Sequence, residues 1–303
     1  MAHEPLISII MNCYNSDRFL KEAIDSVYDQ TYQHWEIIFW DNASEDKSSE
    51  IAQSYDDKIK YFRTQSTTPL GEGRNLALQK AEGKYVAFLD CDDMYEPCKL
   101  QKQIDLMELN GYSMCYGSVI TINEDGLVKK QTPVANKSGF LLGSLLKKYE
   151  INMQSVLIRR STLEELRLGF PAHLKYCPDY NLFMNICALS TVGVIREFLV
   201  RYRIVENSLS RKTVDLVSDE MKFTLDEITE NHPQLKTKYE DEFSLAYQKL
   251  HYYDAVASLY HEDKKQARIH LKSIVYKRPS YFALNLLLLL PISSKQILQI
   301  LGR

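Results

Sequence analysis

The sequence lacks the long apolar run that a membrane-spanning helix needs. Its most apolar segment, residues 281–292, is too short to cross a bilayer and is interrupted by Pro291. Residues 1–5 also lack a charged start followed by a long apolar region, so no secretory signal is evident. We therefore expect a cytoplasmic protein.

Metal-binding cysteine patterns and blocks of basic residues are missing as well. The six cysteines show no Cys-x-x-Cys pairing and the seven histidines show no paired helical spacing, so we expect free thiols and no zinc site. The net charge is −3 with acidic and basic residues mixed, which excludes the electrostatic signature of a nucleic-acid-binding protein. The cysteines are Cys13, Cys91, Cys98, Cys115, Cys177 and Cys187.

The chain does contain alternating strand and helix patterns over its first hundred residues. With 303 residues, of which 45% are hydrophobic, it can bury a full core and an additional segment. A helix that Ser16 can cap follows the first apolar run, and Gly83 is positioned to end the third helix. The alternation predicts an α/β fold, a parallel sheet with helices on both faces. The strands are expected at 6–11, 35–40, 59–62 and 85–89, and the second and third helices at 46–55 and 74–81.

Three carboxylates follow the last of these strands. Asp90 and Asp92 are two residues apart, a spacing that lets both side chains point the same way and share a hard divalent ion with a diphosphate. Asp93 is either a third metal contact or the N-cap of a segment that begins near Pro97. Tyr14 and Asp41 follow two other strands, so we expect them at the same sheet edge as Asp92.

The order of these motifs resembles that of the family 2 glycosyltransferases. The resemblance runs from Ser8 to about Ser210 and implies the GT-A fold, a Rossmann-like and mostly parallel central sheet flanked by helices. It also implies an inverting transferase that takes a sugar from a nucleotide-diphospho-sugar. The motifs are Ser-Ile-Ile-x-x-x-Tyr-Asn at 8–15, Gln-Thr-Tyr at 30–32, Trp-Asp-Asn-Ala-Ser at 40–44, Gly-Arg-Asn-Leu-Ala at 73–77 and Ala-Glu-Gly-Lys-Tyr-Val-Ala-Phe-Leu-Asp-Cys-Asp-Asp at 81–93.

The resemblance gives four residues a role in nucleotide binding. It implies that Tyr14 stacks near the base, that Asp41 and Asn42 line the nucleoside pocket, and that Arg74 approaches the base or the phosphates. Many relatives have an aspartate where this chain has Asn42, and an amide can donate as well as accept. A UDP-sugar is the first expectation for the donor, with dTDP- and GDP-sugars left open.

The same resemblance assigns the metal and the base. It implies that Asp92 is the main ligand of Mn²⁺ or Mg²⁺, and that Asp90 holds the ribose or metal-bound water. The segment 176–184 is similar to the family's Glu-Asp-x-Asp-Leu motif, and its central acid aligns with Asp179. Asp179 is thereby expected to remove the proton from the acceptor hydroxyl, although an acid at a helix start can also serve only as a cap.

Several positions depart from the family pattern. Pro178 stands where relatives usually carry Glu, and Asn181 where many have Asp, so details of the acceptor side are not carried over. Val205 occupies the place of a histidine that supports the metal or the diphosphate. We therefore expect the diphosphate to be held by Asp92 together with a basic group such as Arg203 or Arg211.

The chain is expected to have two domains, a catalytic domain at 1–212 and a helical extension at 213–303. Helical spacing recurs at 216–230, 239–259 and 264–276, and residues 253–268 resemble one tetratricopeptide-like hairpin, which we interpret as a packed helical pair. The apolar segment near the C-terminus is flanked by basic residues. Residues 277–303 are therefore expected to contact either a membrane interface or another protein surface.

The sequence thus predicts a metal-dependent glycosyltransferase that modifies a glycan or lipid-linked acceptor in bacterial surface polysaccharide or glycoconjugate synthesis. A nucleotidyltransferase is disfavoured because residues 12–15, after the first strand, contain no glycine for a phosphate loop. The alternative is a non-catalytic protein that binds sugar nucleotides or acts in assembly. Retention of Asp92 and Asp179 argues against that alternative.

Overall fold

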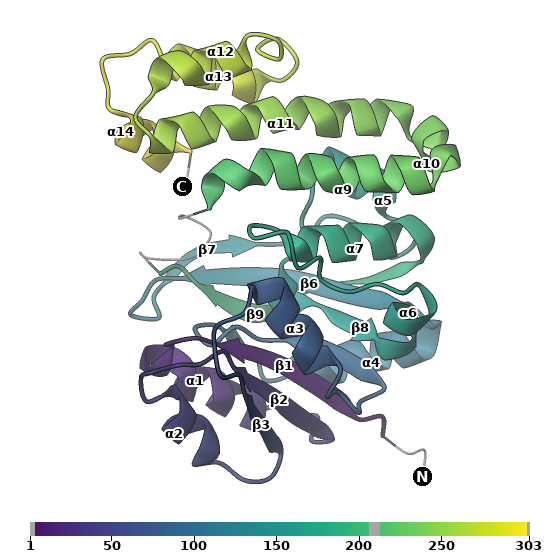
Figure 1. The fold of residues 1–303 in the computed structure, drawn as a ribbon. Coiled ribbons are helices and arrows are strands. Elements are labelled where there is room, and N and C mark those ends of the chain that lie inside the picture. Colours follow the sequence, from purple (N-terminus) through teal and green to yellow (C-terminus); the bar gives the residue numbers. More distant parts are fainter. Residues whose placement is uncertain (1–3, 206–212, 302–303) are drawn as a thin grey trace. The chain divides into compact units, whose positions relative to one another are not determined.

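The computed structural model describes residues 4–205 and 213–301, which form two compact units. The first unit comprises residues 4–145 and 149–205 and contains a nine-stranded sheet. The second comprises residues 146–148 and 213–301 and is helical. Figure 1 shows both units and labels most of the elements by the names used below.

The sheet of the first unit is mixed rather than parallel throughout. Its strand order is β3-β2-β1-β4-β8-β6-β9-β5, with β7 paired to β6. The first four strands are parallel, as their apolar runs predicted, whereas β8 is antiparallel to both β4 and β6. The strands are β1 (Ile7–Cys13), β2 (Trp35–Asp41), β3 (Ile59–Arg63), β4 (Tyr85–Phe88), β5 (Met94–Tyr95), β6 (Met114–Ile122), β7 (Val128–Thr132), β8 (Leu157–Arg159) and β9 (Val192–Arg203).

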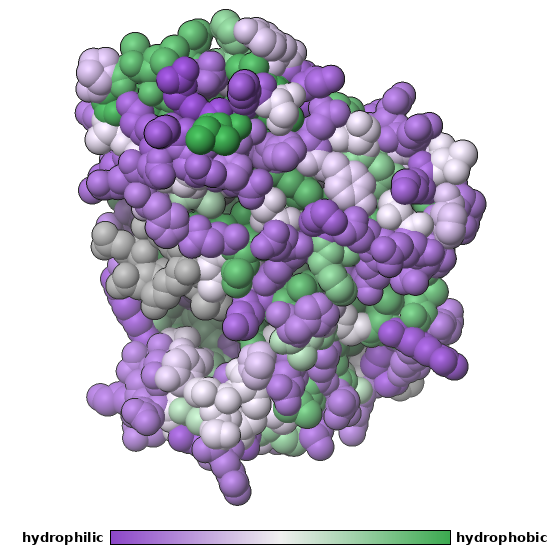
Figure 2. Space-filling view, turned by 45° about the horizontal axis from the view of Figure 1, so that its top comes forward, coloured by the Kyte–Doolittle hydropathy of each residue, from purple (hydrophilic) through white to green (hydrophobic). Residues whose placement is uncertain are grey.

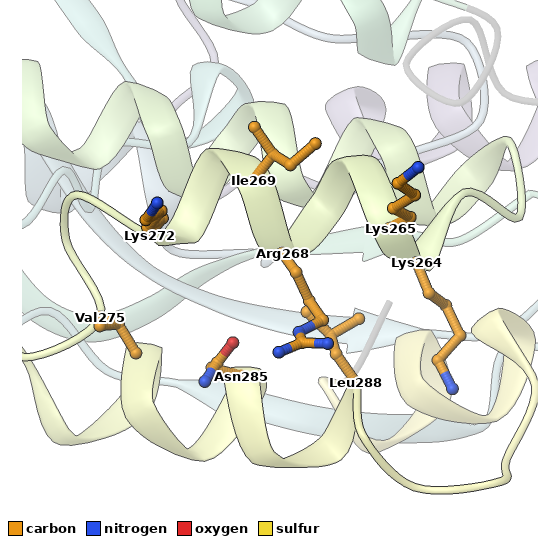
Figure 3. Close-up of a pocket in the computed structure, with 8 residues that line it drawn as sticks. All are labelled: Lys264, Lys265, Arg268, Ile269, Lys272, Val275, Asn285 and Leu288. Atoms are coloured by element: carbon orange, nitrogen blue, oxygen red, sulfur yellow. The ribbon is translucent and has the colours of Figure 1, made fainter.

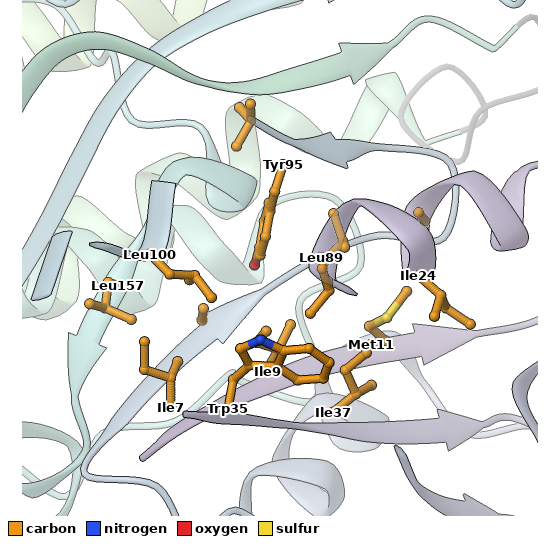
Figure 4. Packing of buried hydrophobic residues seen from close by; sticks show 14 of the residues in the cluster. Ile7, Ile9, Met11, Ile24, Trp35, Ile37, Leu89, Tyr95, Leu100 and Leu157 are labelled. Atoms are coloured by element: carbon orange, nitrogen blue, oxygen red, sulfur yellow. The ribbon is translucent and has the colours of Figure 1, made fainter. Parts of the chain in front are cut away.

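Helices cover this sheet because the strands beneath them are apolar on both faces. Every residue of β2 and β4 is buried, and α1 contributes a matching apolar stripe that includes Leu20, Ile24 and Val27. Figure 4 shows Ile9, Met11 and Ile37 packed within this core. The helices are α1 (Asp17–Tyr28), α2 (Ser48–Gln53), α3 (Leu70–Leu78), α4 (Lys99–Asn110), α5 (Leu142–Lys147), the short η1 (Met153–Ser155), α6 (Arg160–Glu165) and α7 (Pro178–Leu189).

Three local expectations are wrong. Helix α3 begins at Leu70 and ends at Leu78, so Gly83 does not end it; a Cβ at Gly83 would lie 2.6 Å from the Ser8 nitrogen, and glycine is needed there for close packing. The Ser16 hydroxyl makes no cap and donates instead to the Tyr14 carbonyl, at 3.1 Å. Asp93 is not a cap either, because the next helix, α4, starts only after Cys98.

The second unit is a set of helices with its own apolar core. Ala255 and Leu259 of α11 share this core with Ala267 and Leu271 of α12. None of the described helices is both long and apolar enough to span a bilayer. The helices are η2 (Val214–Leu216), α9 (Val217–Asn231), α10 (Pro233–Lys238), α11 (Glu240–Tyr260), α12 (Lys264–Leu271), α13 (Pro279–Leu287) and α14 (Ser294–Ile300).

Candidate active site

The carboxyl ends of β1, β2 and β4 form one edge of the sheet. Cys13 of β1 pairs in register with Asp41 of β2, and Ile10 of β1 pairs with Phe88 of β4. This register brings three loops together, at residues 14–16, 42–47 and 89–93. In open α/β sheets ligands bind at such an edge, so the carboxylates after β4 lie where a ligand is expected.

Asp90 is fixed by partners from two other elements. Arg74 of α3 forms an ion pair with its Oδ1 at 3.2 Å, and Gln154 of η1 donates to its Oδ2 at 2.6 Å. The backbone nitrogen of Asp90 donates in return to Gln154 Oε1, at 3.0 Å. Arg74 is buried and its guanidinium lies 5.4 Å from the centre of the Phe170 ring. Asp90 therefore has a fixed orientation while its side chain stays 37% exposed.

A buried arginine holds the loop that carries the other two carboxylates. The backbone nitrogen of Arg203 donates to Asp93 Oδ1 at 2.7 Å, and its Nε donates to the Asp92 carbonyl at 2.9 Å. Its remaining nitrogens donate to the Glu124 carbonyl at 2.8 Å and to Glu22 at 2.7 Å. The expectation that Arg203 binds the diphosphate is therefore wrong, because all three of its guanidinium nitrogens already donate to protein oxygens. Arg211 lies outside the described residues.

The protein only partly stabilises the charged forms of Asp92 and Asp93. Burial and the neighbouring charge of Asp90 raise the pKa of Asp92 to about 6, although Arg203 partly opposes the shift. Burial and both neighbouring acids raise the pKa of Asp93 well above its usual value, and its buried Oδ2 has no partner. A cation beside Asp92 would lower this cost, so the carboxylates fit a hard divalent ion.

Protein side chains alone do not complete a metal site. Within residues 4–205 and 213–301, no three His, Cys, Asp or Glu side chains are grouped closely enough to hold an ion. Mg²⁺ in proteins is commonly held by one or two carboxylates, with water and substrate phosphates as the other ligands. The arrangement at Asp92 suits that mode of binding.

Asp41 and Asn42 form hydrogen bonds that hold the loops of the predicted nucleoside pocket in place. Asp41 is fully buried; its Oδ2 accepts from Tyr61 at 2.5 Å and from Arg63 at 2.9 Å, and its Oδ1 accepts from the Ser44 nitrogen at 2.7 Å. The Asn42 amide bonds the backbone of Thr68 in both directions, at 2.9 Å each. Both side chains are thus placed at the predicted edge, but their polar atoms are already engaged.

Other groups at the same edge are not engaged by the protein, namely the ring of Tyr14 and two buried polar atoms. Tyr14 is 54% exposed, so its ring is accessible to a ligand. Asn12 Oδ1 and Trp40 Nε1 are buried without a hydrogen-bond partner, although such groups are normally paired. A Cβ at Gly73 would lie 2.8 Å from the Asn12 amide nitrogen and 3.6 Å from the Trp40 ring, so Gly73 leaves no spare space between them.

Asp179 lies in the first turn of α7, directly after Pro178. Burial raises its pKa above the usual range, the nearby charge of Arg74 lowers it, and Asp90 raises it further. Arg74 thus forms an ion pair with Asp90 and also acts electrostatically on Asp179. A carboxylate with a raised pKa is suited to accept a proton near neutral pH.

Sequence reasoning missed Gln154 and assigned a different role to Arg203, and these two residues position the cluster. Gln154 and Arg203 come from η1 and the end of β9, far from Asp90 in the chain. A buried glutamine carries no motif of its own, and only the sheet topology brings it to Asp90. Arg203, the last residue of β9, was noted from sequence, but its contacts with Asp93 and Glu22 had no local signal.

Similarity to known proteins agrees with this geometry. The profile of glycosyl transferase family 2 matches residues 8–166. A UDP-Glc:alpha-D-GlcNAc-diphosphoundecaprenol beta-1,3-glucosyltransferase from Escherichia coli is 31% identical over 68% of this chain and 79% of its own length. A putative teichuronic acid biosynthesis glycosyltransferase from Bacillus subtilis is 29% identical over 68% of this chain and 82% of its own length.

Solved structures share the fold at low sequence identity. S. aureus TarS 1-349 in complex with UDP-GlcNAc matches with a TM-score of 0.61 and 17% identity, over 89% of this chain and 91% of that one. A mannosyltransferase from Pyrobaculum calidifontis in complex with GDP-Man and Mn²⁺ matches with a TM-score of 0.61 and 15% identity, over 95% and 85%. With the family profile covering more than half of its residues, the chain belongs to glycosyl transferase family 2, has the GT-A fold and is a glycosyltransferase with relatives in bacterial cell-surface polysaccharide synthesis.

Proposed function

We propose that this protein transfers one sugar, with inversion, from a nucleotide-diphospho-sugar to a hydroxyl of a glycan or lipid-linked acceptor. The observation that carries the proposal is the charge arrangement at the sheet edge, where Arg74 pairs with Asp90 and acts on Asp179 while Arg203 compensates Asp92 only in part. This arrangement offers a cation-binding carboxylate and a basic carboxylate around one edge. We assign the reaction to residues 1–212.

In this proposal the donor lies across the carboxyl ends of β1, β2 and β4. Tyr14 stacks on the base, because its exposed ring is the aromatic side chain at this edge that is free to do so. Asp41 and Asn42 frame the nucleoside pocket by fixing the loops at 42–44 and 64–68. Arg74 and Asp90 hold one another in place beside the phosphates and the ribose.

Asp92 and Asp179 have different roles in the proposed reaction. Asp92 would hold Mn²⁺ or Mg²⁺, which when bound neutralises charge on the departing nucleoside diphosphate. Asp179 takes the proton of the acceptor hydroxyl as that oxygen attacks the anomeric carbon from the face opposite the diphosphate, and the bond to the diphosphate breaks. A single displacement of this kind inverts the configuration.

A UDP-sugar is the proposed donor, with dTDP- and GDP-sugars as the other candidates. The E. coli relative uses UDP-Glc by its name, and TarS binds UDP-GlcNAc. The proposed acceptor is part of a bacterial surface polysaccharide or glycoconjugate. By their names, one relative acts on a diphosphoundecaprenol-linked sugar and the other is a putative teichuronic acid biosynthesis enzyme. We place the protein in the cytoplasm at the inner membrane face, with contact through residues 277–303.

Calorimetric titration with UDP, dTDP and GDP, each with and without Mn²⁺, tests the proposal. The expected result is that one diphosphate binds and that its binding needs the metal. Asp92→Asn should lose the gain in nucleotide affinity that the metal gives. Tyr14→Phe is the matched control and should bind like the wild type. If no nucleotide binds the wild type, the transferase proposal fails; if nucleotide binds but no sugar is transferred to any acceptor, a non-catalytic binding role is favoured instead.

A further inference from the structure

Residues 264–303 have a charge composition unlike the rest of the chain. This segment contains eight lysines and arginines and no aspartate or glutamate. The first 263 residues carry the other 29 basic residues and all 40 acidic ones. A segment of pure positive charge on an acidic protein indicates an anionic partner.

Helix α13 in this segment is apolar on both of its faces. Tyr281 and Leu284 are buried in the core of the second unit. Phe282 and Leu286 lie at helical spacing on the opposite face, and Leu289 follows in the turn after the helix; the three side chains are 43%, 48% and 55% exposed. A helix that is hydrophobic all round is normally covered on all sides, but the described part of the chain leaves the outer face of α13 largely exposed.

A groove between α12 and α13 places cations beside this apolar face. Its volume is about 560 Å³, and Figure 3 shows the Arg268 side chain directed from α12 toward Asn285 of α13 and Leu288, the residue after that helix. Lys264 donates to the carbonyls of Leu290 and Ile292, at 2.7 and 3.1 Å, and so joins the start of α12 to the chain after α13. The other cations lining the groove are Lys265, Arg268 and Lys272, and all three are exposed.

An aromatic pair lies next to these helices. Tyr276 is 87% exposed, and its ring centre is 6.1 Å from that of Phe282. Lys277 and Arg278 stand between the two in sequence. Figure 2 shows hydrophobic side chains beside strongly hydrophilic ones in the region at the top of the view. Exposed aromatics mixed with basic residues are typical of proteins that rest in the interface of a bilayer.

We infer that α12, α13 and the loop between them form a docking surface for an anionic phospholipid bilayer, with lipid phosphates in the groove and the outer face of α13 among the acyl chains. The charge supports this occupant over a second copy of the chain, since a two-fold contact through this surface would bring the same cations against one another. The inference gives the proposed membrane contact a lipid class and named residues. It does not depend on the transfer reaction.

Flotation of the full chain with vesicles tests the inference. We expect binding to vesicles of phosphatidylcholine mixed with phosphatidylglycerol, weak binding to phosphatidylcholine alone, and partial release by salt. Replacing Lys265, Arg268 and Lys272 by Gln should weaken binding to the mixed vesicles about a hundredfold, because each basic residue near such a surface adds about a factor of five. The matched control replaces the exposed lysines Lys60, Lys129 and Lys130 by Gln and should bind like the wild type.

A second variant separates lipid insertion from protein contact. Replacing Phe282, Leu286 and Leu289 by Ser should abolish the binding that survives high salt, and folding should persist because these side chains are already exposed. The mass of each protein in solution is measured in parallel. The inference is overturned if the wild type binds neither vesicle type. It is also overturned if the wild type is a dimer and only the Ser variant is a monomer. Nucleotide titration of the same samples shows separately whether the proposed transferase site is intact.

Discussion

Gln154 and Asp90 are joined by two hydrogen bonds, from the Asp90 nitrogen to Gln154 Oε1 at 3.0 Å and from Gln154 Nε2 to Asp90 Oδ2 at 2.6 Å. Gln154 is buried, so water does not compete strongly for these bonds. Asp90 is thereby oriented from one side by an amide and from the other by Arg74, which bonds its second oxygen at 3.2 Å. The pairing fixes the first carboxylate of the acidic loop.

Substituting Gln154→Leu should weaken nucleotide binding by roughly tenfold and lower the free energy of unfolding by about 2 kcal/mol, because Asp90 loses both bonds. Titration calorimetry and thermal unfolding give the two quantities. The matched control is Glu36→Gln, which perturbs the buried bond from Ser8 to Glu36, 2.6 Å long, at the amino end of the same sheet. That control should lose stability and keep its nucleotide affinity. Equal affinity in the two variants would contradict a positioning role for Gln154.

Much of this site was predictable because its motifs are local. The runs that end at Cys13, Asp41 and Phe88 are buried parallel strands, so their carboxyl ends had to meet at one edge. The partners of Asp41 and Asp90 were not predictable. They come from Tyr61, Arg63 and Gln154, whose places depend on strand pairing and on the position of a short 3₁₀ helix.

The second half of the sheet could not be read from sequence for a similar reason. Strand β8 has only three residues, and its antiparallel position between β4 and β6 is set by tertiary packing rather than by its own pattern. Likewise, α3 extends back to Leu70 through two glycines, which sequence rules assign to a loop. Glycine is needed at position 73 despite its low helix propensity, because a Cβ there would collide with the Asn12 side chain.

Substituting Tyr14→Ala should weaken nucleotide binding by roughly ten- to a hundredfold, since base stacking on an aromatic ring contributes about 1–3 kcal/mol. The midpoint of thermal unfolding should not change, because the ring is 54% exposed. Tyr14→Phe retains the ring and serves as the control. Wild-type affinity in Tyr14→Ala would exclude stacking by this residue.

Substituting Asp179→Asn should reduce sugar transfer by at least a hundredfold and leave nucleotide binding unchanged, because the amide cannot accept the proton. The raised pKa of Asp179 also predicts that wild-type transfer increases with pH until this carboxyl is ionised. Rates are measured as release of nucleoside diphosphate with acceptor present.

The control for this prediction is Asp17→Asn, since Asp17 is also an acid in the first turn of a helix. Both variants weaken a helix N-terminus by a few tenths of a kcal/mol. If Asp179 is only a cap, the two variants will lose activity and stability alike. Loss of transfer in Asp179→Asn alone supports the role of base.

Substituting Arg203→Met should lower the free energy of unfolding by about 3 kcal/mol, because it leaves Glu22 and two backbone carbonyls without their donor. It should also weaken metal-dependent nucleotide binding at neutral pH, since Arg203 lowers the pKa of Asp92. The control is Arg201→Met on the same strand, whose exposed ion pair with Glu96 contributes at most about 1 kcal/mol. Similar losses in both variants would contradict the role given to Arg203.

The last prediction concerns Lys99, which is fully buried against the Tyr95 ring and donates to Gln103 at 2.7 Å. Burial lowers the pKa of Lys99 from 10.5 to about 7. Between these two values the unfolded chain binds more protons than the folded one, so the contribution of Lys99 to stability rises with pH from about 7 and is lost as pH falls through 7.

Lys99→Met removes this titration. The difference in free energy of unfolding between variant and wild type should therefore be largest below pH 7, in favour of the variant, and should shrink by a few kcal/mol toward pH 10. Chemical unfolding at several pH values measures it. Lys102→Met, on the same helix at an exposed ion pair with Glu197, controls for the replacement of a lysine of α4 by methionine. A flat difference for Lys99→Met would mean that its amine stays charged in the folded protein.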